Sequence, residues 1–209
     1  MQTQTTSLKD QWQRIAILTA SLAALAALNG SRGHTADFEV DPGHSRVGFK
    51  VRHLVSKTSG EFRDFGGRLV FDDKKPDGGK VDFTIKAASI NTNEPKRDEH
   101  LKSPDFFDVK KFPTLSFTSK KLVPGSEGKY KLEGDLTIHG VTKPVTFDVD
   151  YHGVQKDPWG GTRAGFTATT KVNRRDYGLT WNKALETGGL LVGEDVEIEL
   201  EIEALQKKI

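Results

Sequence analysis

Residues 97–114 of the chain, RDEHLKSPDFFDVKKFPT, gather acids, bases and one histidine around a pair of adjacent phenylalanines. Arg97, Asp98 and His100 are residue types that act as general acids, general bases or charge stabilisers in enzymes. At this spacing they can equally form an ion-pair and capping network that orients a short helix. We favour the network and expect no catalytic residues, because the chain has no cysteine nucleophile and no G-x-S-x-G motif.

Metal ions and nucleotide cofactors are not predicted either. The six histidines show no H-x-H, H-x-x-x-H or H-E-x-x-H spacing, the local patterns that favour a metal site. Histidines that converge from separate strands stay a minor alternative. The chain lacks G-x-G-x-x-G and G-x-x-x-x-G-K-[ST], so no nucleotide-binding loop is expected.

The distribution of charge argues against a nucleic-acid partner. The formal net charge is +2, and the segment before residue 37 carries all of it, through Lys9, Arg14 and Arg32 against Asp10. Residues 37–209 are formally neutral and do not offer the basic surface that a polyanion needs.

The first 36 residues have the pattern of an export signal. Arg14 precedes an apolar run at residues 15–28, IAILTASLAALAAL, which suits the hydrophobic region of a secretory signal and is short for a transmembrane helix. The alternative is a buried helix of the domain. We predict a signal peptide over residues 1–36, with Ala36 as a candidate cleavage position. The absence of cysteine excludes disulfides and a lipoprotein anchor.

From residue 37 onward, apolar residues recur with a period of two, which is typical of strands with one buried and one solvated face. The acids between Asp195 and Glu203 are most simply the solvated face of the last such strand. The alternating apolar residues are Val47, Phe49, Val51, Val81, Phe83, Ile85, Leu115, Phe117, Leu132, Leu136, Ile138, Val145, Phe147, Val149, Tyr151, Phe166, Ala168, Val172, Val196, Ile198, Leu200 and Ile202.

Turn signals separate these strands at residues 41–43, 75–79, 124–128 and 157–161. The spacing predicts an all-β meander of hairpins joined in sequence. For about eight strands, each apolar on one face, a closed antiparallel barrel buries every apolar face and leaves no open edge. A two-layer sandwich is the competing architecture. A barrel of this size can be filled by its own side chains or can hold one small ligand.

One segment breaks the period of two. Residues 94–108 are predicted to form a short helical excursion between two strands, with Asn93 as a candidate cap and Pro95 in the first turn. Pro104 is expected to end the helix. A connection of this length inside a meander is usually functional or covers an opening.

The two phenylalanines of this segment, Phe106 and Phe107, are expected to act as a lid. Adjacent residues on a helical turn point about 100° apart. We therefore expect one ring to face the barrel interior and the other to hold the turn against the barrel wall.

Six stretches of the chain together resemble the YceI-like family of exported, lipocalin-like, polyisoprenoid-binding proteins. The resemblance runs from about Phe38 to Ala204. The stretches are DPGHSRVGFKVRHL at 41–54, GEFRDFGGRLVFD at 60–72, ASINTNEPKRDEHLKSPDFFDVKKFPTLSF at 88–117, GDLTIHGVTKPVTF at 134–147, DPWGGTRAGF at 157–166 and NRRDYGL at 173–179.

The resemblance implies that residues 37–209 form an extended antiparallel eight-stranded lipocalin-like barrel around an apolar tunnel. It implies a periplasmic protein that binds a polyisoprenoid, a quinone-like molecule or another amphiphilic lipid with a long apolar chain. It further implies a homodimer and transient contact with a membrane. No cofactor is expected other than such a bound lipid.

On this interpretation the large inward residues are candidates for the tunnel wall, although each would serve equally as an ordinary core side chain. A polar head group would lie at the mouth. An enzyme acting on a bound isoprenoid, or a structural barrel with a filled core, are the alternative functions. The candidate wall residues are Phe49, Val51, Phe83, Ile85, Phe106, Phe107, Phe117, Leu136, Phe147, Phe166 and Ile198, and the candidate head-group residues are His44, His53, Arg97 and Asp176.

Overall fold

A computed structural model describes residues 35–72, 75–186 and 190–207 of the protein. The predicted signal peptide, residues 1–36, therefore lies almost wholly outside the described residues. From Thr35 onward the chain forms one compact unit. Within the described ranges, no helix combines the length and the apolar character that a membrane crossing requires.

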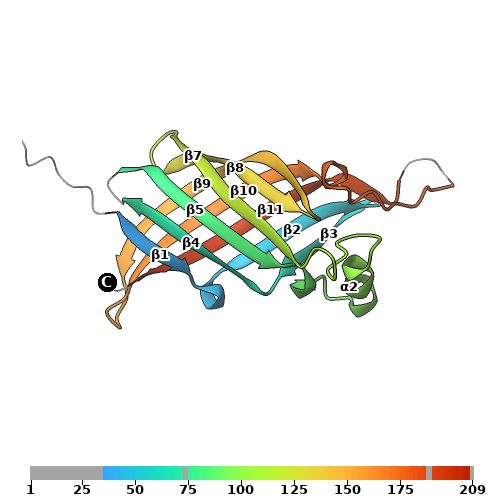
Figure 1. Ribbon diagram of the computed structural model, residues 1–209, viewed down its shortest axis with the longest axis horizontal. Coiled ribbons are helices and arrows are strands. Elements are labelled where there is room, and N and C mark those ends of the chain that lie inside the picture. Colours follow the sequence, from blue (N-terminus) through green and yellow to red (C-terminus); the bar gives the residue numbers. More distant parts are fainter. Residues whose placement is uncertain (1–34, 73–74, 187–189, 208–209) are drawn as a thin grey trace, which may run out of the picture. The chain divides into compact units, whose positions relative to one another are not determined.

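The unit consists of antiparallel strands with short helical segments between them (Figure 1). The strands are β1 (Ala36–Val40), β2 (Arg46–His53), β3 (Ser56–Phe62), β4 (Phe65–Asp72), β5 (Lys75–Lys86), β6 (Ile90–Asn91), β7 (Thr114–Pro124), β8 (Lys129–Ile138), β9 (Val141–Lys156), β10 (Thr162–Asn173) and β11 (Val192–Gln206). The helical segments are the 3-10 turns η1 (Pro42–His44), η2 (Ala87–Ser89) and η3 (Arg174–Tyr177) and the helix α2 (Pro95–Lys102).

The sheet closes on itself because β1 and β2 both pair with the last strand, β11. Val40 lies opposite Ala204 near one end of β11, and Val47 lies opposite Leu200 further along the same strand. The strands β3 and β4 continue one another in the same way, β3 beside β2 and β4 beside β1. The short β6 likewise continues β5, with β6 beside β3 and β5 beside β4. With these three pairs counted as single strands, the described residues form the closed eight-stranded antiparallel barrel that was predicted, and not a sandwich.

The turn-forming residues 41–43 do not make a hairpin. They form η1, in which the Asp41 carboxylate accepts a hydrogen bond from the Gly43 amide at 3.0 Å. The turn expected at residues 75–79 is wrong, because β5 already begins at Lys75, which pairs with Asp72. The turns at 124–128 and 157–161 join β7 to β8 and β9 to β10, as expected.

Strand alternation separates the two faces of β11. Ile198 and Leu200 belong to the apolar interior, while Glu197 and Glu199 point outward. Lys57 lies 2.7 Å from Glu197, and Lys50 lies 3.2 Å from Glu199, both across neighbouring strands. The acidic row is therefore a solvated face with lysine partners, which confirms that prediction.

The predicted helical excursion at residues 94–108 is confirmed, but the helix itself covers only its first part. The helix α2 is capped by Glu94, whose carboxylate accepts from the Arg97 amide at 2.5 Å, and not by Asn93. It ends at Lys102, and the remaining residues to 108 form turns in which the Phe106 amide donates to the Ser103 carbonyl at 3.0 Å. Pro104 offers no amide hydrogen and so cannot continue the helix.

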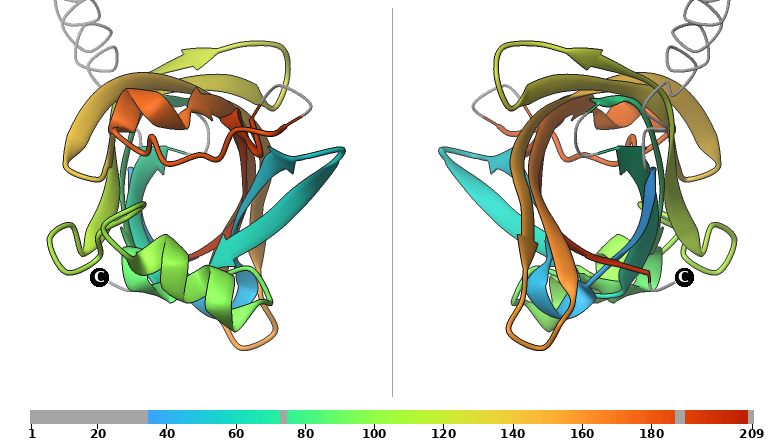
Figure 2. Two further views of the ribbon diagram at one scale, coloured as in Figure 1. Left: turned by 90° about the vertical axis from the view of Figure 1, so that its right-hand side faces the viewer. Right: turned by 90° about the vertical axis from the view of Figure 1, so that its left-hand side faces the viewer.

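One end of the barrel carries the irregular segments. In the end-on view of Figure 2 (left), α2 crosses one side of the opening and the segment around η3 lies on the other. The hairpin of β2 and β3 projects beside them. This end, called the α2 end below, is where the polar residues of the barrel interior gather.

Candidate functional site

The barrel encloses a cavity of about 390 Å³. This volume falls in the range of ordinary small-molecule sites. Leucine, isoleucine, valine and aromatic side chains make up most of the wall. The interior is thus an apolar compartment and not a barrel filled by its own side chains.

The cavity is long. Its wall includes Val192 at the start of β11 and Ile202 near the end of that strand. Ten residues of strand rise by about 33 Å at about 3.3 Å per residue. Because barrel strands tilt by about 40°, the wall extends about 25 Å along the barrel axis. This shape suits a long, thin, apolar molecule.

The structure places every candidate wall residue on the lining of this cavity. Whether each contacts a ligand stays a prediction, since a core role would place it there too. The wall residues in place are Phe49, Val51, Phe83, Ile85, Phe106, Phe107, Phe117, Leu136, Phe147, Phe166 and Ile198.

Glycines on neighbouring strands let two of the large rings lie flat against the wall. A Cβ atom at Gly60 would approach the Phe49 ring to 2.3 Å, and one at Gly134 would approach the Phe117 ring to 2.4 Å. Real Cβ atoms essentially never come so close. The glycines therefore set how far each ring reaches into the cavity.

The expected division of roles between the two lid phenylalanines is not what the structure shows, because both rings line the cavity. Phe106 packs against His100 and Trp181, at centroid distances of 5.1 and 5.2 Å. Phe107 packs edge-on against Phe62 of β3 at 5.8 Å. These residues lie on a turn and not on a continuous helix, so the 100° rule does not govern their directions.

The charged residues beside the lid form a bracing network around Thr92. Asp98 is buried and accepts hydrogen bonds from the Thr92 amide at 2.9 Å and from its hydroxyl at 2.5 Å. Arg97 donates to the same hydroxyl and to the Thr92 carbonyl, each at 2.8 Å. The capping and ion-pair interpretation of this segment therefore agrees with the geometry.

His100 lies on the cavity wall and has two kinds of neighbour. Its Nε2 atom is 2.9 Å from the Asp105 carboxylate, and its ring packs edge-on against the Trp181 indole at 4.9 Å. Trp181 follows η3, so this contact joins the two sides of the opening. A histidine with a carboxylate partner has the composition of a general base, and this pair, with His100 on the described wall of the cavity, favours the enzyme alternative.

The four candidate head-group residues are divided by the structure. His53 and Arg97 line the cavity at the α2 end. His44 and Asp176 are absent from the described lining and are exposed. His44 belongs to η1, outside the barrel wall, and Asp176 lies on the outer side of η3, so a head group inside the cavity does not reach them.

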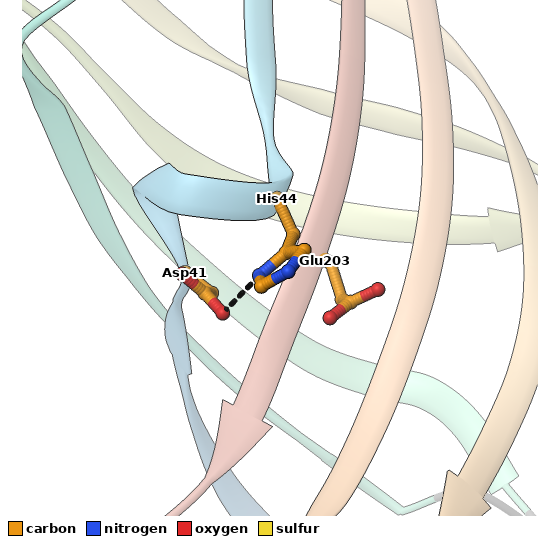
Figure 3. A group of neighbouring side chains, drawn as sticks. All are labelled: Asp41, His44 and Glu203. Atoms are coloured by element: carbon orange, nitrogen blue, oxygen red, sulfur yellow. Dashed lines mark hydrogen bonds and ion pairs between the residues drawn. The ribbon is translucent and has the colours of Figure 1, made fainter. Parts of the chain in front are cut away.

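His44 instead belongs to a cluster with Asp41 and Glu203 (Figure 3), whose ligand atoms lie within 4.8 Å of one another. The cluster resembles a cation site, but Arg163 already supplies the positive charge. Its Nη1 atom lies 2.8 Å from Asp41 and 2.5 Å from Glu203, and its Nε atom lies 3.0 Å from Asp157. The cluster is an ion-pair clamp between η1, β11 and the β9–β10 turn.

The hydrogen bonds and ion pairs of this clamp lower the pKa of two carboxyl groups. Hydrogen bonds from Arg163 and His44 lower the pKa of Asp41 to about 2. The hydrogen bond that the Gly161 amide donates to Asp157 lowers the pKa of that carboxyl group, and Arg163 adds to the effect. Both carboxylates are therefore charged at any ordinary pH.

Arg174 and Trp181 line the cavity but were not among the candidate residues. Arg174 stands at the start of η3 and is 5% exposed. Burial lowers the pKa of its guanidinium group, and the negative charge of Glu194 opposes that change. The NRRDYGL motif contains Arg174, but the motif alone does not show which of its two arginines turns inward.

Comparison with known proteins gives concordant results. Residues 38–204 match the YceI-like domain. A UPF0312 protein of Pseudomonas putida strain W619 is 37% identical over 204 residues, which cover 96% of this chain and 100% of the relative. The crystal structure of a YCEI protein from Campylobacter jejuni is similar with a TM-score of 0.65 at 36% identity, covering 76% of this chain and 91% of that one.

A more distant structure shares the fold. It is a polyisoprenoid binding domain from Saccharophagus degradans implicated in plant cell wall breakdown, with a TM-score of 0.62 at 14% identity. The similarity covers 83% of this chain and 99% of that domain. The match to the YceI-like domain runs from β1 into the end of β11 and so spans the barrel. The resemblance seen in the sequence is confirmed, and this chain belongs to the YceI-like family.

Proposed function

We propose that the protein binds one amphiphilic lipid with a long apolar chain, such as a polyisoprenoid or a quinone-like molecule, inside the barrel. The observation that carries the proposal is the cavity of about 390 Å³, whose wall is apolar along most of its length. Burial of an apolar chain is favourable by about 25 cal/mol per Å² before the entropy costs of binding. The polyisoprenoid binding domain of Saccharophagus degradans, which shares the fold, supports the same ligand class.

The polar residues of the wall indicate how the lipid is oriented. Apart from Lys80, Ser116, Tyr130 and Tyr151, the residues with polar side chains on the described wall belong to segments at the α2 end. A head group placed there can reach hydrogen-bond donors, while the chain extends toward the β7–β8 and β9–β10 turns. Those α2-end residues are His53, Thr58, Thr92, Arg97, His100, Arg174 and Trp181.

Lipid analysis tests this function. Protein purified from the periplasm of its host, or of an expression host, is analysed intact under native conditions and then extracted for lipid mass spectrometry. We expect one lipid molecule per chain, with a mass that corresponds to a polyisoprenoid or another long-chain amphiphile. Protein that carries no lipid and takes none up from a supplied mixture would contradict the proposal.

The location and the assembly are parts of the same proposal. A periplasmic site of action follows from the apolar run at residues 15–28, and the intact mass of protein from cell fractions tests it. A chain that keeps Met1 and stays in the cytoplasm would overturn the export proposal. The homodimer stays a prediction, which light scattering of the purified protein checks.

Contact with a membrane surface has one supporting feature at the α2 end. The tip of the β2–β3 hairpin exposes Leu54 and Val55, the latter completely. The Leu54 amide donates to the carbonyl of Leu191, which lines the cavity, at 3.1 Å. An apolar tip beside the mouth is suited to brief insertion among lipid head groups during loading.

The second candidate function is an enzyme that acts on the bound lipid. The pairing of His100 with Asp105 at the mouth favours it. On this alternative, lipid recovered after incubation changes in mass with the wild-type protein and does not change with His100→Ala. Binding alone predicts that the same lipid is recovered unchanged from both proteins.

A further inference from the structure

Arg174 is the cationic residue buried most deeply in the described wall of the cavity. Its Nε atom donates to the Gly193 carbonyl at 2.9 Å, and its Nη1 atom donates to the Leu179 carbonyl. The Leu179 carbonyl belongs to the segment after η3, and the Gly193 carbonyl belongs to the start of β11. The guanidinium group is therefore held in one orientation before any ligand arrives.

The third nitrogen, Nη2, has no hydrogen-bond acceptor within the described part of the chain, although it is fully buried. A buried N–H group without a partner costs free energy, and a buried charge without a counter-ion costs more. The described residues place no carboxylate within ion-pair distance of Arg174. Glu194, whose negative charge acts on Arg174, pairs with Arg175 at 2.9 Å.

The charged residues on the described wall of the cavity also favour an anionic ligand. Neither aspartate nor glutamate occurs among the described lining residues, whereas Arg97, Arg174 and Lys80 do. A guanidinium group stays protonated in proteins, and its planar array of donors suits carboxylate and phosphate oxygens. The structure thus offers a positive, partly unsatisfied donor at the head-group end of an apolar compartment.

We propose that Arg174 anchors the head group, and that its Nη2 hydrogens bind an anionic oxygen, carboxylate or phosphate, at the end of a long-chain lipid. The proposal rests on the lipid-binding function and narrows it from amphiphiles in general to anionic ones. It places the head beneath the η3 segment and the chain along the wall toward the opposite end.

Three ligands with one geranylgeranyl chain test this selectivity by calorimetry on the delipidated protein: geranylgeranoic acid, geranylgeranyl phosphate and geranylgeraniol. One charge-assisted hydrogen bond in a dry site predicts that the wild-type protein binds the two anions about 10- to 100-fold more tightly than the alcohol. Arg174→Gln should bind all three with the affinity of the alcohol, because its amide keeps donors but loses the charge.

Matched variants separate this role from a structural one. Arg175→Gln removes the neighbouring exposed arginine and should keep the wild-type preference. Arg174→Lys keeps the charge and should retain part of the preference. If Arg174→Gln does not fold, the wild-type preference and the Arg174→Lys result still decide the matter. Inorganic phosphate alone should bind far more weakly than geranylgeranyl phosphate, since it lacks the buried chain.

The outcomes distinguish a failure of the lipid-binding function from a failure of the anchor role of Arg174. If none of the three ligands binds, the lipid-binding function itself fails. If the acid, the phosphate and the alcohol bind the wild-type protein equally, the function stands and the anchor role of Arg174 is overturned. A preference for anions that persists in Arg174→Gln also overturns it, as does tight binding of inorganic phosphate by itself.

Discussion

The His100 imidazole stands edge-on against the Trp181 indole, with ring centroids 4.9 Å apart and an interplanar angle of 89°. The two residues come from α2 and from the segment after η3, which lie on opposite sides of the same opening of the barrel (Figure 2). Phe106 packs against both rings. The contact is therefore a bridge of aromatic side chains across the mouth of the cavity.

Trp181→Ala should open this bridge and speed the release of bound lipid. Aromatic pairs contribute about 0.5–1.5 kcal/mol each beyond their buried area, and Trp181 makes two ring contacts, one edge-on with His100 and one tilted with Phe106. We expect the rate of lipid dissociation to rise by about tenfold and the urea midpoint to change only slightly. The measurement is the loss of a fluorescent lipid to excess vesicles, followed by stopped flow.

Trp159→Ala is the control for this experiment, because Trp159 is 84% exposed and lies in the β9–β10 turn at the other end of the barrel. It should leave the dissociation rate unchanged. If Trp181→Ala also releases lipid at the wild-type rate, the lipid does not leave past this bridge.

A substitution at Gly134 should show that the cavity shape depends on a glycine. The new Cβ atom in Gly134→Ala would approach the Phe117 ring to 2.4 Å and the Thr118 carbonyl oxygen to 2.5 Å. Overpacking of this kind costs about 1–3 kcal/mol. We expect a lower urea midpoint and weaker lipid binding, because the displaced ring moves into the cavity.

The matched control is Gly66→Ala in β4, where a Cβ atom would meet nothing within 4 Å. It should preserve both stability and binding within experimental error. Equal behaviour of the two alanine variants would show that the wall can relax around Phe117 without loss.

The cavity wall was predictable from the sequence because strand alternation is a local property. Phe147 and Val149 share one face of β9 for the same stereochemical reason in any sheet, and a closed barrel turns that face inward. This prediction does not require knowing which side chains pack against that face. The same argument correctly placed the acids of β11 on the outside.

The polar end of the cavity could not be predicted in this way. Trp181 and Arg174 come from irregular segments, and their positions depend on contacts with α2 and β11 that are distant in sequence. The turn residues at 41–43 were read as a hairpin for a similar reason. Strand β11 is long enough to pair with both β1 and β2, so the chain continues along it after η1.

The Arg163 clamp should make stability depend on pH in acid. The pKa of Asp41 falls from its ordinary value of 3.8 to about 2 in the folded protein. A carboxyl group with a lowered pKa stabilises the fold above its unfolded pKa, and this contribution disappears as the pH falls from about 4 to about 2. Arg163→Met should lower the urea midpoint at pH 7 and flatten the decline of stability below pH 4.

Urea unfolding at a series of pH values checks this prediction. Arg68→Met is the control, because the pair of Arg68 with Asp37 is largely exposed and should contribute little. A decline below pH 4 that is as steep in Arg163→Met as in the wild-type protein would show that other carboxyl groups control acid unfolding.

The exposed tip of the β2–β3 hairpin makes the loading route testable. Leu54 and Val55 form an apolar point beside the mouth, and Arg52 on the same hairpin is exposed and basic. A charged residue at this point would resist insertion among lipid head groups. We expect Val55→Glu to slow lipid uptake from vesicles of phosphatidylethanolamine and phosphatidylglycerol by about tenfold, and to leave the equilibrium affinity for lipid in detergent unchanged.

Trp159→Glu, which changes an exposed apolar residue at the other end of the barrel, should load at the wild-type rate. If Val55→Glu loads as fast as the wild-type protein, the hairpin tip does not take part. If Trp159→Glu is the slow variant instead, lipid enters from the opposite end, and the proposed orientation of the bound chain has to be reversed.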